Sequence, residues 1–244
     1  MRFASWLSQH SAVLALRGQN QRLASLALAF AELQKLEYAR ATPVDHQTAL
    51  DNLNREKEIE RKFSGHGAEG TTFLLDRLSE INAREKAVIH GPDDVEEALR
   101  FQISELAAGR PFVRYAICHM LSEMYSLADA TERTSMLKAI VDSYLPSTHG
   151  KDNAETLDGS LFRLGRDGIE GFLMLANSPS VFNRCHAASI LKELASGAPV
   201  IDCKSQDFDR RQSIEAFEQW WRINASKVQW PAFPSYFDVP ARSR

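Results

Sequence analysis

Residues 112–124 read FVRYAICHMLSEM, and the spacing of the apolar side chains in this stretch decides the fold. The apolar positions recur every three or four residues: Phe112, Ala116, Ile117, Met120, Leu121 and Met124. This spacing places them on one face of an α-helix. The same period, carried by residues of high helix propensity, continues over most of the chain, and β-branched runs bounded by turns are scarce. The sequence therefore predicts an all-α protein.

Glycine, proline and polar capping residues divide this pattern into predicted helices. The expected ranges are 5–16, 20–40, 43–62, 72–89, 93–108, 111–127, 131–145, 154–163, 166–176, 179–196 and 207–227. Thr42 and Thr71 are predicted N-caps, and either Asp207 or Asp209 is expected to cap the last helix. The polar segment 147–153 divides residues 1–146, an N-terminal helical array, from residues 154–244. We expect the two parts to form one continuous domain.

A second stretch repeats the first at a constant offset of 70 residues. Residues 182–194 read FNRCHAASILKEL, so that Phe112, Arg114 and Leu121 match Phe182, Arg184 and Leu191. Each copy is preceded by a predicted helix that ends in Leu-Ala. An offset of 70 is about twice a 35-residue unit, which lies in the range of helical-hairpin repeats.

This pattern resembles HEAT-type repeats over roughly residues 93–225. The features in common are Phe-x-Arg at the start of the second helix, small residues after it and a following leucine; the segment from Arg210 to Trp221 also resembles the end of many bacterial HEAT-like proteins. The resemblance implies a right-handed stack of helix pairs, an α-α superhelix that serves as a binding scaffold. Residues 207–244 would then cap the last pair, since a terminal repeat has no neighbour to cover its apolar face.

Charge and cysteine content narrow the classes of function. The net charge is −3, and the most charged stretch, residues 55–62, balances four basic residues against three acidic ones. Nucleic-acid binding is therefore not expected, because it needs a clustered basic excess. An odd count of three cysteines (Cys118, Cys185 and Cys203) favours free thiols in a reducing compartment. We expect a cytoplasmic protein without a membrane span, since the apolar run 23–31 starts late for a signal peptide and continues in helical register.

Three local patterns suggest chemistry, and each has a simpler structural interpretation. Residues 65–70 spell G-x-G-x-x-G, but a charged helix rather than a strand precedes them, which favours a helix–helix loop. The pairs Cys118-His119 and Cys185-His186 have the wrong spacing for a zinc site and favour packing. No catalytic motif, cofactor site or metal site is predicted.

The expected function is a non-enzymatic scaffold or adaptor for protein–protein interaction, including an immunity-type protein that binds a toxin in a bacterium. The alternative is a HEAT-like DNA glycosylase or another nucleic-acid-processing enzyme, which would need a basic groove and a catalytic carboxylate. Arg114 and Arg184 either contact an acidic ligand or join neighbouring repeats. The predicted partner-facing strip lies opposite the apolar stripe and comprises Tyr115, His119, Ser122, Ser189 and Lys192, with Cys185 beside the last two.

Overall fold

The computed structural model describes residues 18–36, 45–89, 110–145 and 151–228. These residues form helices and the connections between them, with no strand in the described ranges, so the all-α prediction is confirmed there. In the same ranges no helix is both long enough and apolar enough to cross a bilayer.

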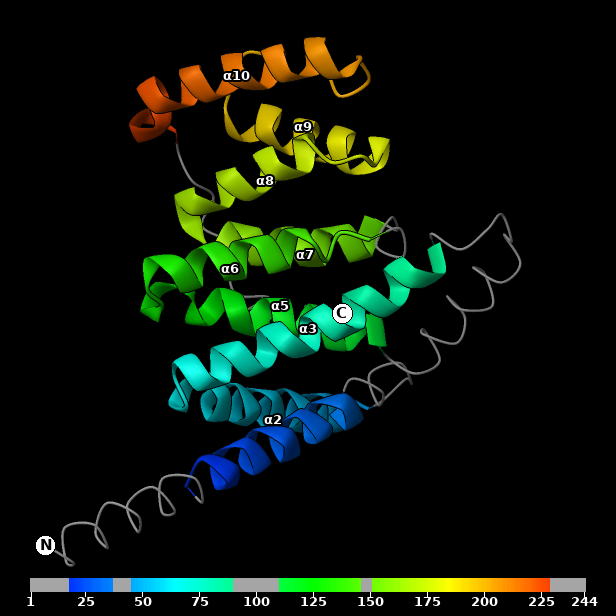
Figure 1. Ribbon diagram of the computed structural model, residues 1–244, viewed down its shortest axis with the longest axis vertical. Coiled ribbons are helices and arrows are strands. Elements are labelled where there is room, and N and C mark those ends of the chain that lie inside the picture. The colour runs from blue at the N-terminus through cyan, green and yellow to red at the C-terminus, as the bar shows by residue number, and fades with distance from the viewer. Residues whose placement is uncertain (1–17, 37–44, 90–109, 146–150, 229–244) are drawn as a thin grey trace, which may run out of the picture.

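The helices follow one another along the long axis of the molecule (Figure 1). The first covers residues 18–36. The others are α2 (His46–Gly65), α3 (Ala68–Ile89), α5 (Arg110–Met124), α6 (Ala130–Val141), α7 (Lys151–Arg163), α8 (Gly168–Ala176), α9 (Val181–Leu194) and α10 (Asp207–Asn224). Short 3-10 turns follow three of them, at Tyr125–Leu127, Gly165–Asp167 and Ala225–Lys227.

Helices that are not consecutive in the chain also pack together. Helix α5 lies against α7, α3 contacts α6, and α6 contacts α8. Among consecutive helices, α5 packs on α6, α6 on α7, α7 on α8 and α8 on α9. Helices from both sides of the predicted division at residues 147–153 therefore pack against each other.

Apolar side chains at helical spacing form the core, as the sequence predicted. On α5, Ala116, Ile117, Met120, Leu121 and Met124 are all buried. In the matching stretch on α9, Leu191 is buried, and Ile190 and Leu194 are partly buried against the core.

The apolar run near the N-terminus packs in the same core. Leu26 and Leu33 are fully buried, and the ring of Phe30 meets that of Phe73 at a centroid distance of 5.9 Å.

The glycine-rich segment 65–70 contains the tight turn between α2 and α3, so its interpretation as a helix–helix connection is correct. Only His66 and Gly67 lie between the helices, and Gly67 adopts a φ of +54°. At Gly70 a Cβ atom would lie 2.1 Å from the carbonyl oxygen of Phe63, so only glycine lets α3 approach α2 this closely. The predicted N-cap Thr71 is therefore wrong: α3 already begins at Ala68, and the Thr71 hydroxyl donates to the Gly67 carbonyl.

Two other predicted helix starts also shift. The N-cap of α2 is Asp45, whose carboxylate accepts from the Thr48 amide at 2.9 Å, while Thr42 lies outside the described residues. The N-cap of α10 is Gln206, and both predicted caps, Asp207 and Asp209, lie in the first helical turn. Carboxylates there still interact favourably with the positive end of the helix dipole.

The last helix contributes apolar side chains at helical spacing to the core. Ile214 and Phe217 are buried, and Trp220 and Trp221 are partly buried against the same core. The rings of Phe217 and Trp220 lie 6.2 Å apart. The tail after residue 228, which the sequence predicts to complete the cap, lies outside the described residues.

Candidate functional site

One turn of α9, residues 183–186, connects four different parts of the molecule. Ser180 caps the helix just before it, with its hydroxyl 3.4 Å from the Asn183 amide. Neighbouring helix residues point about 100° apart, so these four side chains reach out in different directions. The Asn183 amide donates to the carbonyl of Tyr144 at 2.9 Å, on the loop after α6.

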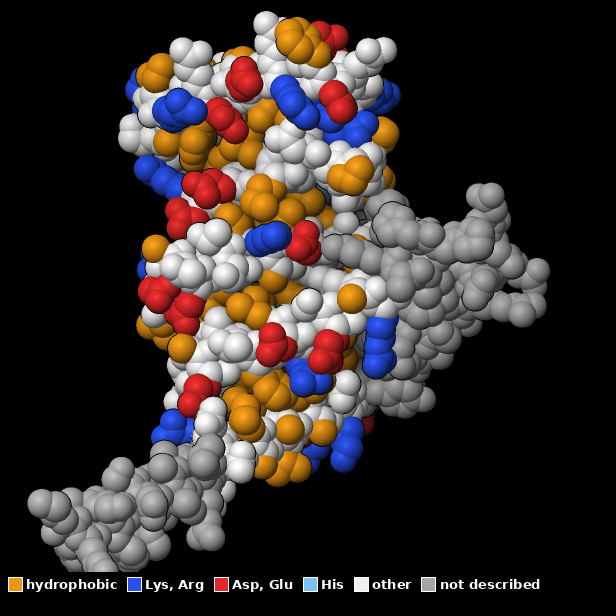
Figure 2. Space-filling model, viewed as in Figure 1, with side chains coloured by type: hydrophobic (Ala, Val, Ile, Leu, Met, Phe, Trp, Pro, Cys, Tyr) orange, Lys and Arg blue, Asp and Glu red, His pale blue; other side chains and the backbone are white. Residues whose placement is uncertain are grey.

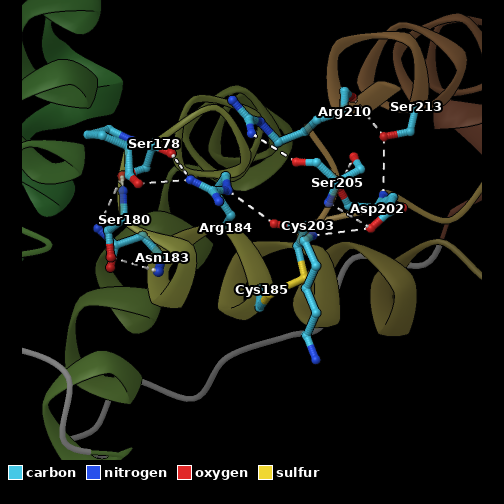
Figure 3. The surroundings of a disulfide bond; sticks show 12 residues. Ser178, Ser180, Asn183, Arg184, Cys185, Asp202, Cys203, Ser205, Arg210 and Ser213 are labelled. Atoms are coloured by element: carbon cyan, nitrogen blue, oxygen red, sulfur yellow. Dashed lines mark hydrogen bonds between the residues drawn. A yellow bond between two sulfur atoms is a disulfide. The ribbon is translucent and has the colours of Figure 1, made fainter. Parts of the chain in front are cut away.

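Cys185 forms a disulfide with Cys203, 18 residues later, with the Cα atoms 4.9 Å apart (Figure 3). The expectation of three free thiols is therefore wrong, and only Cys118, which is buried, is free. The bond could not be predicted from cysteine spacing, because the loop after α9 must first fold back along that helix. Disulfides persist mainly in oxidising compartments, so the cysteines no longer support a cytoplasmic localisation.

Arg184 holds two loops together from a buried position. Its Nε atom donates to the Cys203 carbonyl at 3.0 Å, and its Nη1 atom donates to the carbonyls of Ser178 and Pro179 at 3.0 and 2.8 Å (Figure 3). The side chain is 8% exposed. Within the described ranges no carboxylate forms an ion pair with it. All three acceptors belong to the turn before α9 and the loop after it, so these contacts join local loops rather than neighbouring helix pairs.

A charged cleft of about 750 Å³ opens beside Arg184, between the turn that joins α8 to α9 and one face of α10. Its lining residues are Asn177, Pro179, Arg184, Asp207, Arg210, Arg211, Ile214, Glu215 and Glu218. The α10 members recur at intervals of three and one, which places them on a single face of the helix. Along that face the basic pair 210–211 precedes the acidic residues Glu215 and Glu218.

Arg210 is the second buried arginine of the charged cleft. Its Nη2 atom donates to the Asp207 carboxylate and its Nη1 atom lies 3.4 Å from the Ser205 carbonyl. The hydrogen bond from Arg210 and the positive charges of Arg210, Arg211 and Arg184 lower the pKa of Asp207 below its ordinary value. The exposed Asp207 carboxylate thus serves as the counterion of this basic end.

His186 belongs to a buried polar network on the other side of α9. Its Nε2 atom lies 3.0 and 2.9 Å from the two carboxylate oxygens of Asp158, and the Tyr144 hydroxyl donates to Asp158 at 2.8 Å. Burial first, and the charge of Asp158 second, raise the pKa of Tyr144 well above its ordinary value. The phenol therefore stays a proton donor, and both carboxylate oxygens of Asp158 are engaged within the protein.

A groove of about 400 Å³ runs between α3 and α6. Leu75 and Ala139 contribute apolar surface, and Asp76, Lys138 and Asp142 are among its charged lining residues. Asn82 lies in the same groove, donates its amide to the Ser143 hydroxyl at 3.0 Å and keeps a buried amide oxygen without a hydrogen-bond partner. An occupant could therefore find apolar contacts and charges there, whereas the Asn82 amide oxygen lies beneath the groove surface.

The predicted partner-facing strip is not a single exposed surface in the described part of the chain. Ser189 and Lys192 on α9 are exposed, whereas Tyr115 and Ser122 on α5 are buried, and the Ser122 hydroxyl donates to the His119 carbonyl at 2.7 Å. His119 itself is mostly enclosed, with its Nδ1 atom 3.8 Å from Glu123. Both faces of α5 are covered because this helix lies inside the array.

The chain matches no protein-family model, no curated protein and no solved structure. In the described ranges no group of three or more histidine, cysteine or acidic residues is placed to hold a metal ion.

Proposed function

We propose that the protein is a helical-repeat scaffold of the HEAT-like type that binds a protein partner without catalysing a reaction. The observation that carries the proposal is the groove between α3 and α6, which combines apolar walls with charged lining residues. Protein interfaces commonly join an apolar centre to a polar rim in this way. An adaptor and an immunity-type protein would both use such a groove.

The surface around the groove supports the same proposal. On the face viewed in Figure 2, lysine and arginine side chains alternate with aspartate and glutamate, and apolar side chains are visible between the helices. Neither charge dominates this face. A nucleic-acid site would instead gather basic side chains along the path of the phosphates.

The partner-binding role can be tested by photo-crosslinking from inside the groove. A photoreactive residue would replace Ser79 on α3 or Ser135 on α6, both exposed and both lining the groove. Thr134 is the matched control, because it is exposed on α6 but does not line the groove. We expect both groove positions to capture the same protein from the native extract and Thr134 to capture none. Equal capture from all three positions, or none from any, would contradict the proposal.

A DNA-processing enzyme is the alternative. Asp158 is its best candidate for a buried carboxylate, but Tyr144 and His186 occupy both carboxylate oxygens. A fluorescence titration with duplex DNA near physiological salt separates the two functions. A scaffold of this charge should bind DNA no more tightly than about micromolar, and sub-micromolar affinity would favour the enzyme.

A further inference from the structure

The charged cleft between the α8–α9 turn and α10 presents charges of opposite sign in a fixed order. Asp207 and the basic residues Arg184, Arg210 and Arg211 occupy one end, and Glu215 and Glu218 follow along α10. From residue 210 to residue 218 the helix rises about 12 Å. The charged cleft therefore has a basic end and an acidic end, separated by about the length of four extended residues.

The basic end provides more positive charge than its own carboxylate neutralises. Arg184 and Arg210 are 8% and 7% exposed, and a buried guanidinium normally has a carboxylate partner. Arg210 has Asp207, but Arg184 has only the three backbone carbonyls among the described residues. Figure 3 shows the side chain of Arg210 reaching toward Arg184 from α10. An entering carboxylate would meet donors from both arginines.

The acidic end has room for a positive charge. Glu215 is exposed, and among the described residues Glu218 has one long ion pair, with Arg222 at 3.7 Å. Ile214 lies between the two ends and is buried against the core. A volume of about 750 Å³ is far larger than a simple ion needs and suits a short stretch of peptide.

We propose that the charged cleft binds an extended segment of a protein partner that carries an acidic side chain and, about four residues away, a basic one. The acidic side chain lies between Arg184 and Arg210, where it replaces or joins Asp207, and the basic side chain faces Glu215 and Glu218. The inference rests on the proposed scaffold function and names the chemistry of one partner segment. It uses a surface separate from the α3–α6 groove.

Short blocked peptides test this pairing directly. The probe is an N-acetylated, C-amidated peptide with glutamate and lysine four residues apart, and the controls carry two glutamates or two lysines at those positions. We expect calorimetric titration at low salt to show saturable binding of the mixed peptide and binding about threefold to tenfold weaker for each control. Equal binding of all three peptides, or no saturation up to millimolar concentration, would overturn the proposal.

Substitutions in the exposed part of the charged cleft locate the site. Arg211→Glu should weaken binding of the mixed peptide about threefold to tenfold and shift preference to the peptide with two lysines. Asp207→Asn removes the internal competitor and should strengthen binding. Arg166→Glu is the matched control, because Arg166 is exposed but lies outside the charged cleft.

If Arg166→Glu weakens binding as much as Arg211→Glu does, the peptide responds only to the net charge of the protein. The proposed location of its binding site in the charged cleft would then be wrong. Capture of a partner through Ser79 or Ser135 does not depend on these titrations. Failure of the peptide test would therefore leave the scaffold function standing, while failure of both experiments would remove both.

Discussion

Arg184 is stable inside the protein because backbone carbonyl oxygens replace the water that a guanidinium normally binds. Three donated hydrogen bonds join the turn before α9 to the loop after it. The disulfide between Cys185 and Cys203 also attaches the loop after α9 to this helix. Arg114 and Arg184, which match in the sequence repeat, are both buried, but the partners of Arg184 come from loops whose path the periodicity of helices does not encode.

The cysteines give a direct test at the residue scale. Protein unfolded in denaturant without a reductant should expose one reactive thiol, Cys118, and three after reduction. In the folded protein Cys118 should not react near neutral pH, because burial raises the pKa of its thiol to about 11. A chromogenic thiol reagent measures all three states.

Cys118→Ser serves as the control and should remove the single thiol of the unreduced, unfolded protein. Three thiols before reduction would show that the bond between Cys185 and Cys203 is absent.

Ionisation of Tyr125 is expected to lower the free energy of unfolding at alkaline pH. Burial, and then the charge of Asp167, raise the pKa of its phenol from 10.0 to about 12. The folded state thus holds this proton more tightly than the unfolded state, so the contribution to stability is complete below pH 10 and disappears as the pH rises toward 12. Tyr125→Phe keeps the ring, which lies 5.6 Å below the Arg133 guanidinium, and removes the titrating group.

Urea unfolding of both proteins, in steps across that pH range, measures the effect. We expect the unfolding free energy of the unmodified protein to fall more steeply than that of Tyr125→Phe. Parallel curves would show that Tyr125 titrates alike in the folded and unfolded states.

At the scale of the element, the sequence predicts helices well and their first residues less well. The stripe on α5 needs only local periodicity, and all of its described members are buried. The first residue of a helix depends on which of several nearby polar side chains accepts from a free backbone amide. How closely the neighbouring helices pack decides which side chain that is. At the α2–α3 turn, Gly70 packs closely against Phe63 of α2. There α3 begins at Ala68, three residues before the predicted N-cap Thr71.

Two glycines near this turn form a matched pair for mutation. Gly70→Ala would place a Cβ atom against the Phe63 carbonyl, whereas the Cβ of Gly65→Ala would meet nothing within 4 Å. We expect Gly70→Ala to lower the unfolding free energy by roughly 2 kcal/mol or more, since backbone must move. Gly65→Ala should be neutral or stabilising by up to about 1 kcal/mol, because alanine favours the helix. Chemical denaturation compares them, and equal effects would rule out the close approach.

At the scale of the whole molecule, helices from both sides of the predicted division at residues 147–153 share one core. The sequence marks that division by polarity, but a polar loop does not show whether the helices on either side touch. The contacts of α5 with α7 and of α6 with α8 are long-range, so no local pattern reports them. The predicted partner-facing strip is not one exposed surface for a related reason, since the burial of Tyr115 and Ser122 depends on which helices cover α5.

Gly171 on α8 is the residue that best tests this shared core. A Cβ atom there would lie 2.7 Å from a methyl group of Leu161 on α7 and 3.0 Å from one of Leu137 on α6. The residue thus touches both sides of the predicted division. We expect calorimetry of the unmodified protein to show one unfolding transition, because its halves are not independent. Gly171→Val should shift that whole transition to lower temperature, at a cost of about 1 to 3 kcal/mol for overpacking.

Gly165→Ala provides a control for a glycine on the same side of the division. A Cβ atom at Gly165 has no neighbour within 4 Å, and only the φ of +64° at this residue disfavours alanine. We therefore expect Gly165→Ala to lower the transition temperature less than Gly171→Val does. If the halves were separate domains, Gly171→Val would split the transition in two, with the part from residues 18–145 unchanged. A single shifted transition requires instead that the packing of α6 against α8 couples the two ends of the array, because damage on α8 then lowers the stability of helices as distant as α3.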